Sequence, residues 1–209
     1  MSRRIEFYFD FGSPNAYLAY KVIPGIEARL GPAFDLKPAL LGGIFKATGN
    51  RSPAEAFAGI PAKLAYEGKE TQRFVRRHAI NDYVRNPHFP VNTLLIMRGA
   101  IAARRLGFFE AYVEAVYRAM WAQGLKMDDP AVVKTALEAA GLPADQILAL
   151  TQDPDVKAEL IKNTEGAVAH GVFGSPSFLV GDELFFGKDR LRDVEEEIAA
   201  QKGLSRPVR

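Results

Sequence analysis

The chain of 209 residues contains no cysteine. Disulfides, thiolate nucleophiles and thiolate metal sites all require cysteine, so the protein itself can supply none of them. Its three histidines, His78, His88 and His170, do not have the spacing of metal ligands, which argues against a metal-dependent hydrolase. The chain also lacks a Gly-x-Ser-x-Gly motif around Ser13, which argues against a Ser-His-Asp hydrolase.

Long apolar runs and a strong charge of one sign are missing as well. The formal net charge is +2, which is too small to indicate a nucleic-acid or membrane partner. No window reaches the ~18 apolar residues of a membrane span. The apolar stretch near the N-terminus is interrupted by Glu6 and Asp10, so it does not resemble a signal peptide. We therefore expect a cytoplasmic protein that binds neither nucleic acid nor membrane.

The composition that is present favours a globular α/β protein, because 48% of the residues are hydrophobic and can form a sizeable core. Apolar and polar residues alternate in 3–11 and again in 33–41, which predicts two strands. Between them, 14–30 has helical periodicity. Strand, helix and strand form a unit in which the strands pair in parallel.

Near the C-terminus, two short apolar runs flank Gly181-Asp182, which predicts a hairpin. A last helix is expected to begin at Asp189.

The middle of the chain has helical patterns, with the exception of an irregular, proline-bearing loop at 80–92. "SPAE" at 52–55 has the form of a capping box, followed by expected helices at 62–79, 93–106 and 108–123. A further helix begins at Asp129, and short helices reach Thr164. We therefore predict one split domain, formed by 1–45 and 165–209, with an inserted helical domain at 46–164.

Ser13 follows the first expected strand and precedes the first expected helix. Serine before proline is a favoured N-cap, so the position can be purely structural. A helix N-terminus also favours an anion, and a hydroxyl there can donate a hydrogen bond to a thiolate or an oxyanion. The residues alone leave both roles open.

A second Gly-Ser-Pro, at 174–176, lies between a helical stretch and the expected hairpin. Cis peptide bonds occur at only about 5–6% of such positions, so an ordinary turn is the simpler interpretation of the dipeptide. Its place in a chain that opens with a strand-helix-strand unit favours a cis Pro176 that lies close to Ser13.

Four separated motifs, "FYFDFGSPNAYLA", "TGNRSP", "NPHFPVNTL" and "VFGSPSFLVGDELFFGKDRL", resemble those of the 2-hydroxychromene-2-carboxylate isomerases and the kappa-class glutathione transferases. The resemblance covers nearly the whole chain and implies a thioredoxin-like fold with a large all-helical insertion, as in the disulfide oxidoreductases. Those oxidoreductases carry Cys-x-x-Cys where this chain has Ser13-Pro14-Asn15-Ala16.

The resemblance implies a glutathione site. Ser13 matches the catalytic serine that faces the glutathione sulfur, and Ser175 matches the residue before a cis proline, Pro176, which pairs with the peptide through its backbone. The resemblance assigns three further residues to glutathione: Asn50, Lys188 and Asp189. Asp189 would meet the γ-glutamyl ammonium, although it can equally be the N-cap of the last helix.

The second substrate is expected beside this site. Asn92 falls near the pocket that the resemblance implies for the electrophile, although Asn50 and Asn92 can equally have loop or capping roles. Tyr83 and Phe89, together with Phe185 and Phe186, suggest an aromatic lining. Related isomerases have two tryptophans where this chain has Phe185-Phe186, and often asparagine or serine at the position of Lys188.

The resemblance implies that glutathione supplies the missing thiol. Its thiolate would add to an activated double bond, allow rotation about the resulting single bond and leave again, which interconverts 2-hydroxychromene-2-carboxylate and trans-o-hydroxybenzylidenepyruvate. Transfer of glutathione to other electrophiles is the first alternative. A non-catalytic thioredoxin-like binding module is the second. From the family, a homodimer is expected.

Overall fold

The computed structural model describes residues 5–31 and 34–204. In this part of the chain, four strands form one sheet of order β2-β1-β3-β4. The strands are β1 (Ile5–Phe9), β2 (Asp35–Pro38), β3 (Ser177–Val180) and β4 (Glu183–Phe186). β1 pairs with β2 in parallel, as predicted, and with β3 in an antiparallel ladder. Residues 3, 4 and 33 of the expected strands lie outside the described residues.

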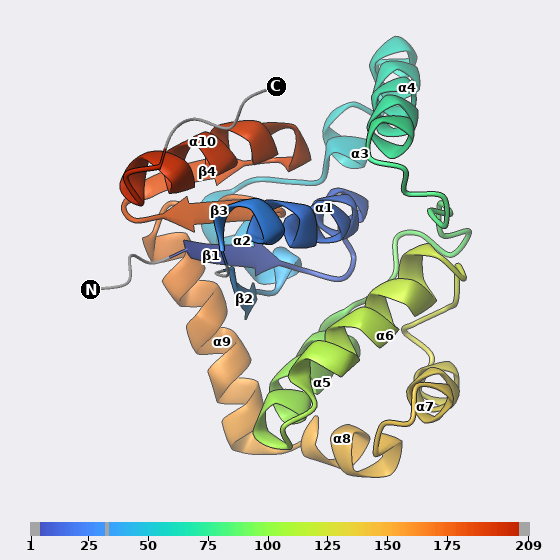
Figure 1. Cartoon of the computed structure of the whole chain (residues 1–209). Coiled ribbons are helices and arrows are strands. Elements are labelled where there is room, and N and C mark those ends of the chain that lie inside the picture. Colours follow the sequence, from blue (N-terminus) through green and yellow to red (C-terminus); the bar gives the residue numbers. More distant parts are fainter. Residues whose placement is uncertain (1–4, 32–33, 205–209) are drawn as a thin grey trace.

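Helices cover both faces of the sheet, as Figure 1 shows. Successive side chains of a strand point to opposite faces. Phe7 and Phe9 therefore join the main core with α1 (Pro14–Leu30) and α10 (Leu191–Gln201). Tyr8 faces the other side and packs in a smaller cluster with residues of α2 (Leu41–Thr48) and α9 (Pro154–Ala169). The thioredoxin-like fold expected from the motifs is confirmed.

Between the two halves of the sheet the described chain forms helices and an irregular segment, 78–93, that connects α4 to α5. The helices are α3 (Pro53–Ala56), α4 (Pro61–Arg77), α5 (Leu94–Arg105), α6 (Phe109–Trp121), α7 (Pro130–Ala139) and α8 (Ala144–Leu150). The expected helices at 62–79, 93–106 and 108–123 correspond to α4, α5 and α6. The capping box at Ser52 and Glu55 is also present. The prediction of a strand up to residue 41 was too long, because α2 begins there.

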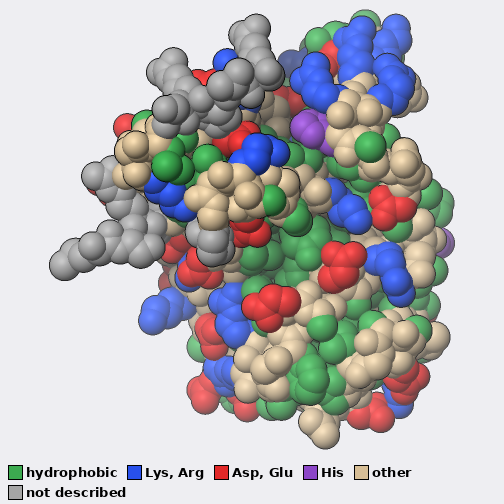
Figure 2. Space-filling model, in the orientation of Figure 1, with side chains coloured by type: hydrophobic (Ala, Val, Ile, Leu, Met, Phe, Trp, Pro, Cys, Tyr) green, Lys and Arg blue, Asp and Glu red, His purple; other side chains and the backbone are tan. Residues whose placement is uncertain are grey.

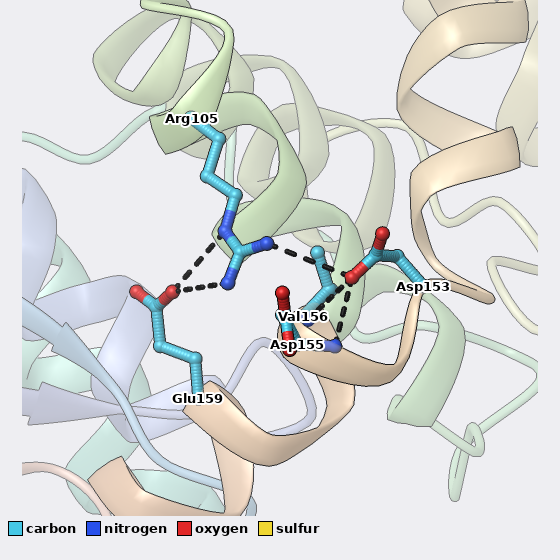
Figure 3. Close-up of polar contacts among 5 residues, drawn as sticks. All are labelled: Arg105, Asp153, Asp155, Val156 and Glu159. Atoms are coloured by element: carbon cyan, nitrogen blue, oxygen red, sulfur yellow. Dashed lines mark hydrogen bonds and ion pairs between the residues drawn. The ribbon is translucent and has the colours of Figure 1, made fainter.

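α9 connects the helical part to the sheet. One end of it packs against α2 and β2, and it also contacts α5. At the α5 contact, Arg105 forms ion pairs with Asp153 at 3.6 Å and with Glu159 at 3.0 Å (Figure 3). The division of the chain at 164–165 stays a prediction, since α9 runs through this position without a break.

α4 projects from the rest of the molecule (Figure 1), and Phe74 is its only buried residue. Lys and Arg side chains gather over this helix in the space-filling view (Figure 2). They belong to a set of cationic residues along α4: Lys63, Lys69, Arg73, Arg76 and Arg77. None of the described helices is both long enough and apolar enough to cross a membrane.

Candidate functional site

Ser13 lies at the N-terminus of α1 and acts as its N-cap. The N–H of Ala16 donates to Ser13 Oγ at 3.2 Å, which satisfies one of the free amides of the first turn. The Ser13 hydroxyl in turn donates to the backbone oxygen of Ser175 at 2.8 Å. Ser13 is 5% exposed. The first turn of α1 contains no acidic residue that would offset the positive end of the helix dipole.

The Ser175–Pro176 peptide bond is cis, as predicted. The hydrogen bond from Ser13 brings the two Gly-Ser-Pro motifs together, although their serines are 162 residues apart in the chain. The backbone N–H of Asp10 also donates to Ser175 Oγ at 3.1 Å. The prediction that Pro176 is cis and close to Ser13 is therefore confirmed. A second cis bond joins Phe89 and Pro90.

Asn50 lies just after the C-terminus of α2, beyond the left-handed Gly49. Its Nδ2 donates to the backbone oxygen of Phe173 at 2.8 Å. This bond connects the end of α2 to the segment that leads into the cis proline. Asn50 is exposed, so its amide is open to a ligand on the same side. The bond explains its position in the fold, and a ligand contact remains a prediction.

Lys188 and Asp189 form a short 3-10 turn, η1 (Lys188–Arg190), between β4 and α10. Lys188 Nζ is 2.9 Å from both carboxylate oxygens of Asp189 and 5.1 Å from the ring centroid of Phe74. The lysine side chain is 4% exposed and that of Asp189 is 68% exposed. Asp189 thus presents a negative charge at the surface, and the cation that pairs with it is buried underneath.

The position of η1 relative to the cis proline is determined by the backbone. The N–H of Gly187 donates to the oxygen of Pro176 at 2.9 Å, and η1 packs against α1. Asp189 is not the N-cap of the last helix. α10 begins at Leu191, and its N-cap residue, Arg190, makes no side-chain capping bond. The capping interpretation of Asp189 is therefore wrong.

The aromatic residues expected around the second substrate do not form a single group of ring contacts. The rings of Tyr83 and Phe89 lie 6.4 Å and 6.2 Å from that of Trp121. Trp121 Nε1 donates to the backbone oxygen of Phe11 at 2.7 Å. This cluster therefore adjoins the turn that carries Ser13.

The neighbouring residues Phe185 and Phe186 point to opposite faces of β4, and only Phe185 packs against the main core to which Trp121 belongs. Phe186 is 42% exposed, and its ring centroid lies 4.5 Å from that of Phe173.

Asn92 is exposed, and its Oδ1 accepts a hydrogen bond from the N–H of Leu94 at 3.0 Å. This is the local turn-forming role that asparagine often has. The next residue, Thr93, is buried and lies close to Gly12. A Cβ on Gly12 would be 3.0 Å from Thr93 Cγ2. Asn92 therefore lies in a segment that contacts the Ser13 turn, and its contact with a substrate remains a prediction.

Two residues that the sequence did not single out help to build the site. The carboxyl of Asp10 is buried and accepts hydrogen bonds from the N–H of Gly12 at 2.8 Å and of Leu41 at 2.7 Å. Burial raises the pKa of Asp10, and the bonds from Leu41, Gly12 and Thr93 offset part of this increase. Trp121, the single tryptophan of the chain, is the other residue. That it is the single tryptophan was the only feature of the sequence that could have indicated its role in the site.

The described residues contain no group of three or more His, Cys, Asp and Glu side chains that could hold a metal ion. Together, the fold and the cysteine-free turn beside a cis proline define a thioredoxin-type protein whose site lacks its own thiol. The model of the DSBA-like thioredoxin domain matches residues 4–199. The chain belongs to this family.

Among curated proteins, the chain is 29% identical over 197 residues to a 2-hydroxychromene-2-carboxylate isomerase of Sphingobium xenophagum, with 93% of this chain and 97% of that protein covered. It is 25% identical over 209 residues to human glutathione S-transferase kappa 1, with 91% and 88% covered. A solved structure of a 2-hydroxychromene-2-carboxylate isomerase superposes with a TM-score of 0.82 at 25% identity and covers 95% of both chains.

Proposed function

We propose that the protein is a glutathione-dependent isomerase that interconverts 2-hydroxychromene-2-carboxylate and trans-o-hydroxybenzylidenepyruvate or a related aromatic pair. The observation that carries the proposal is the Ser13 hydroxyl at the N-terminus of α1, 2.8 Å from the carbonyl of the residue before a cis proline. This chain has no cysteine. Relatives named as this isomerase and as kappa glutathione transferases support the same class.

The residues present fit glutathione, which is a zwitterion at one end and a thiol in the middle. Asp189 offers an exposed carboxylate for the γ-glutamyl ammonium, and the buried Lys188 beneath it holds that carboxylate in place. Ser13 and the free amides at the start of α1 favour a thiolate over a thiol. The Asn50 amide contacts the backbone of Phe173, two residues before Ser175, and the backbone oxygen of Ser175 contacts Ser13.

When bound, glutathione would supply a thiolate that adds reversibly to an activated double bond, so that rotation and elimination return the other isomer. The role of the chain's own residues is to bind glutathione and to orient it. The Ser13 hydroxyl would donate to the thiolate in place of the Ser175 oxygen, and the positive end of α1 would lower the thiol pKa. Tyr83 and Phe89 offer rings to an aromatic substrate, and Asn92 offers an exposed amide.

Calorimetry with glutathione and product analysis test the proposal. We expect a Kd between about 1 mM and 1 μM, which corresponds to roughly −4 to −8 kcal/mol, and isomerisation of the chromene carboxylate. Conjugation of a chloronitrobenzene without isomerisation would favour a kappa-type transferase instead. Absence of glutathione binding at several millimolar would favour the non-catalytic binding module. Asp145→Asn is a control, because Asp145 is exposed on α8 and pairs with Lys134.

We further propose a homodimer and a cytoplasmic location, as the resemblance to these enzymes suggests. Sedimentation at several protein concentrations would test the first, and fractionation of the source cells would test the second. A monomer that is fully active would contradict the proposed assembly without affecting the proposed chemistry.

A further inference from the structure

Asp10 connects four separate segments of the chain around Ser13. Its carboxyl oxygens accept from the N–H groups of Gly12 and Leu41 at 2.8 Å and 2.7 Å, and the Thr93 side chain adds a third hydrogen bond. Its backbone N–H donates to Ser175 Oγ at 3.1 Å, and its backbone oxygen accepts from the N–H of Ser13 at 3.0 Å.

Each of these segments carries a residue of the candidate site. The Gly12 turn carries Ser13, and the cis-proline loop carries Ser175. Leu41 begins α2, the helix that ends just before Asn50, while Thr93 is the neighbour of Asn92. One residue that is 1% exposed therefore links the segments that carry all four residues, three through its carboxyl and that of Ser175 through its backbone N–H.

A carboxylate suits this position better than any other side chain of its size. Its two oxygens can only accept hydrogen bonds, and each of them accepts from one backbone N–H group, that of Gly12 or that of Leu41. The N-cap residue of α2, Leu40, makes no side-chain capping bond, so Asp10 takes over this role from a distant part of the sequence. An asparagine would place an NH₂ group against one of the donors and leave it unpaired in a buried site.

We propose that the Asp10 carboxyl is a positioning group that holds the Ser13 turn, the start of α2 and the Thr93 segment in one arrangement, on which turnover at Ser13 depends. Its effect on turnover rests on the proposed function, whereas its effect on the backbone does not. Asp10 does not reach the surface and acts on a substrate only through Ser13. If the carboxyl were only a buried cap for α2, its loss would lower stability and leave the Ser13 turn in place.

The test compares Asp10→Asn with Asp153→Ala. Asp153 is a matched control, since its carboxyl also accepts from two backbone N–H groups, those of Asp155 at 2.8 Å and Val156 at 3.2 Å. It begins α9 at the contact with Arg105 (Figure 3). Hydrogen exchange is followed at the Ser13 amide, whose acceptor is the Asp10 backbone oxygen. Neither substitution removes that acceptor, so faster exchange reports displacement of the turn.

We expect the Ser13 amide of Asp10→Asn to exchange at least about tenfold faster. Because a misplacement of about 1 Å can cost about 100-fold, kcat per folded molecule should fall about 10- to 100-fold with a smaller change in KM. Asp153→Ala at equal unfolding midpoint should show neither effect. Equal Ser13 exchange and equal kcat in the two variants would overturn the proposal.

Thr93→Val decides the question if Asp10→Asn does not fold, because it removes one of the three donors and keeps the shape of the side chain. It should show the same two effects in weaker form, and an unchanged Ser13 amide and kcat would overturn the proposal. If the wild-type protein neither binds nor turns over glutathione, the proposed function fails. Exchange at Ser13 then decides the positioning role by itself.

Discussion

Ser13→Ala separates the capping role of Ser13 from its proposed chemical role. The substitution removes the cap on Ala16, worth about 1 kcal/mol, and the hydrogen bond to Ser175, worth about 1 kcal/mol. We therefore expect about 2 kcal/mol lower stability, which lowers Tm by about 4–8 °C for a chain of this size. A cap alone would account for half of this loss.

The effect on chemistry follows from the partner that the hydroxyl already has. A hydrogen bond to a charged sulfur is worth about 1.5–3 kcal/mol, but the hydroxyl gives up its bond to the Ser175 oxygen, worth about 1 kcal/mol, to form it. The net difference of about 0.5–2 kcal/mol corresponds to an increase of about 0.4–1.5 in the pKa of the bound thiol. If the interaction is complete in the transition state, turnover falls about 2- to 30-fold.

The assay is thiolate absorbance of bound glutathione against pH, measured together with turnover per folded molecule. Asp129→Ala is the matched control, because Asp129 caps α7 by accepting from the N–H of Ala131 at 2.9 Å. It should lose a cap without changing the thiol titration. The reasoning is refuted if Ser13→Ala loses stability but keeps the wild-type thiol pKa and turnover, since Ser13 would then be a cap only.

Two further substitutions and a pH series test the rest of the site. Asn50→Ala removes the bond to the Phe173 oxygen and an exposed amide. We expect the Kd for glutathione to rise about 2- to 12-fold, because a lost hydrogen bond costs about 0.5–1.5 kcal/mol. An unchanged Kd in calorimetry would speak against a contact between Asn50 and glutathione. Asp189→Asn leaves the buried Lys188 without its anion, so we expect a lower Tm. The Kd for glutathione should rise about 10- to 150-fold, because a hydrogen bond to a charged group is worth about 1.5–3 kcal/mol. A lower Tm with an unchanged Kd would show that Asp189 does not contact glutathione. The pKa of Asp10 is raised on folding, chiefly by burial, so its contribution to stability is complete at acid pH below its unfolded value and is lost as the pH rises through its folded value. Denaturant unfolding from pH 3.5 upwards should therefore show the stability of wild type relative to Asp10→Asn declining with pH, and a difference that grows with pH would reverse the assigned direction.

The sheet and most helices could be predicted because their signals are local. Alternation in β1 and the capping box at Ser52 depend only on neighbouring residues. α2 was missed for the opposite reason. Its capping hydrogen bonds are donated by the N–H of Leu41 to the Asp10 carboxyl and by the N–H of Leu40 to Thr164 Oγ1, and these acceptors lie 31 and 124 positions away in the sequence. No sequence pattern within α2 itself predicts that helix.

In the candidate site, too, contacts between residues far apart in the sequence were hard to predict. The pairing of Ser13 with Ser175 could be expected from two Gly-Ser-Pro motifs and the resemblance. The grouping of Phe185 and Phe186 with Tyr83 could not be tested before the fold was known, because aromatic residues serve cores and binding sites alike. The role of Asp10 was hidden too, because a single aspartate among glycine and aromatic residues gives no indication of its distant partners.

The hydrogen bond between Ser13 and Ser175 spans 162 positions of sequence, and this separation has a consequence for synthesis on the ribosome. β1 emerges first, yet β3, its antiparallel neighbour, emerges only after the whole helical part. Until then one edge of β1 has no partner, and unpaired edges promote association between chains. A fragment that ends before Gly174 would be expected to retain helices, expose an aromatic strand and require a chaperone to stay in solution.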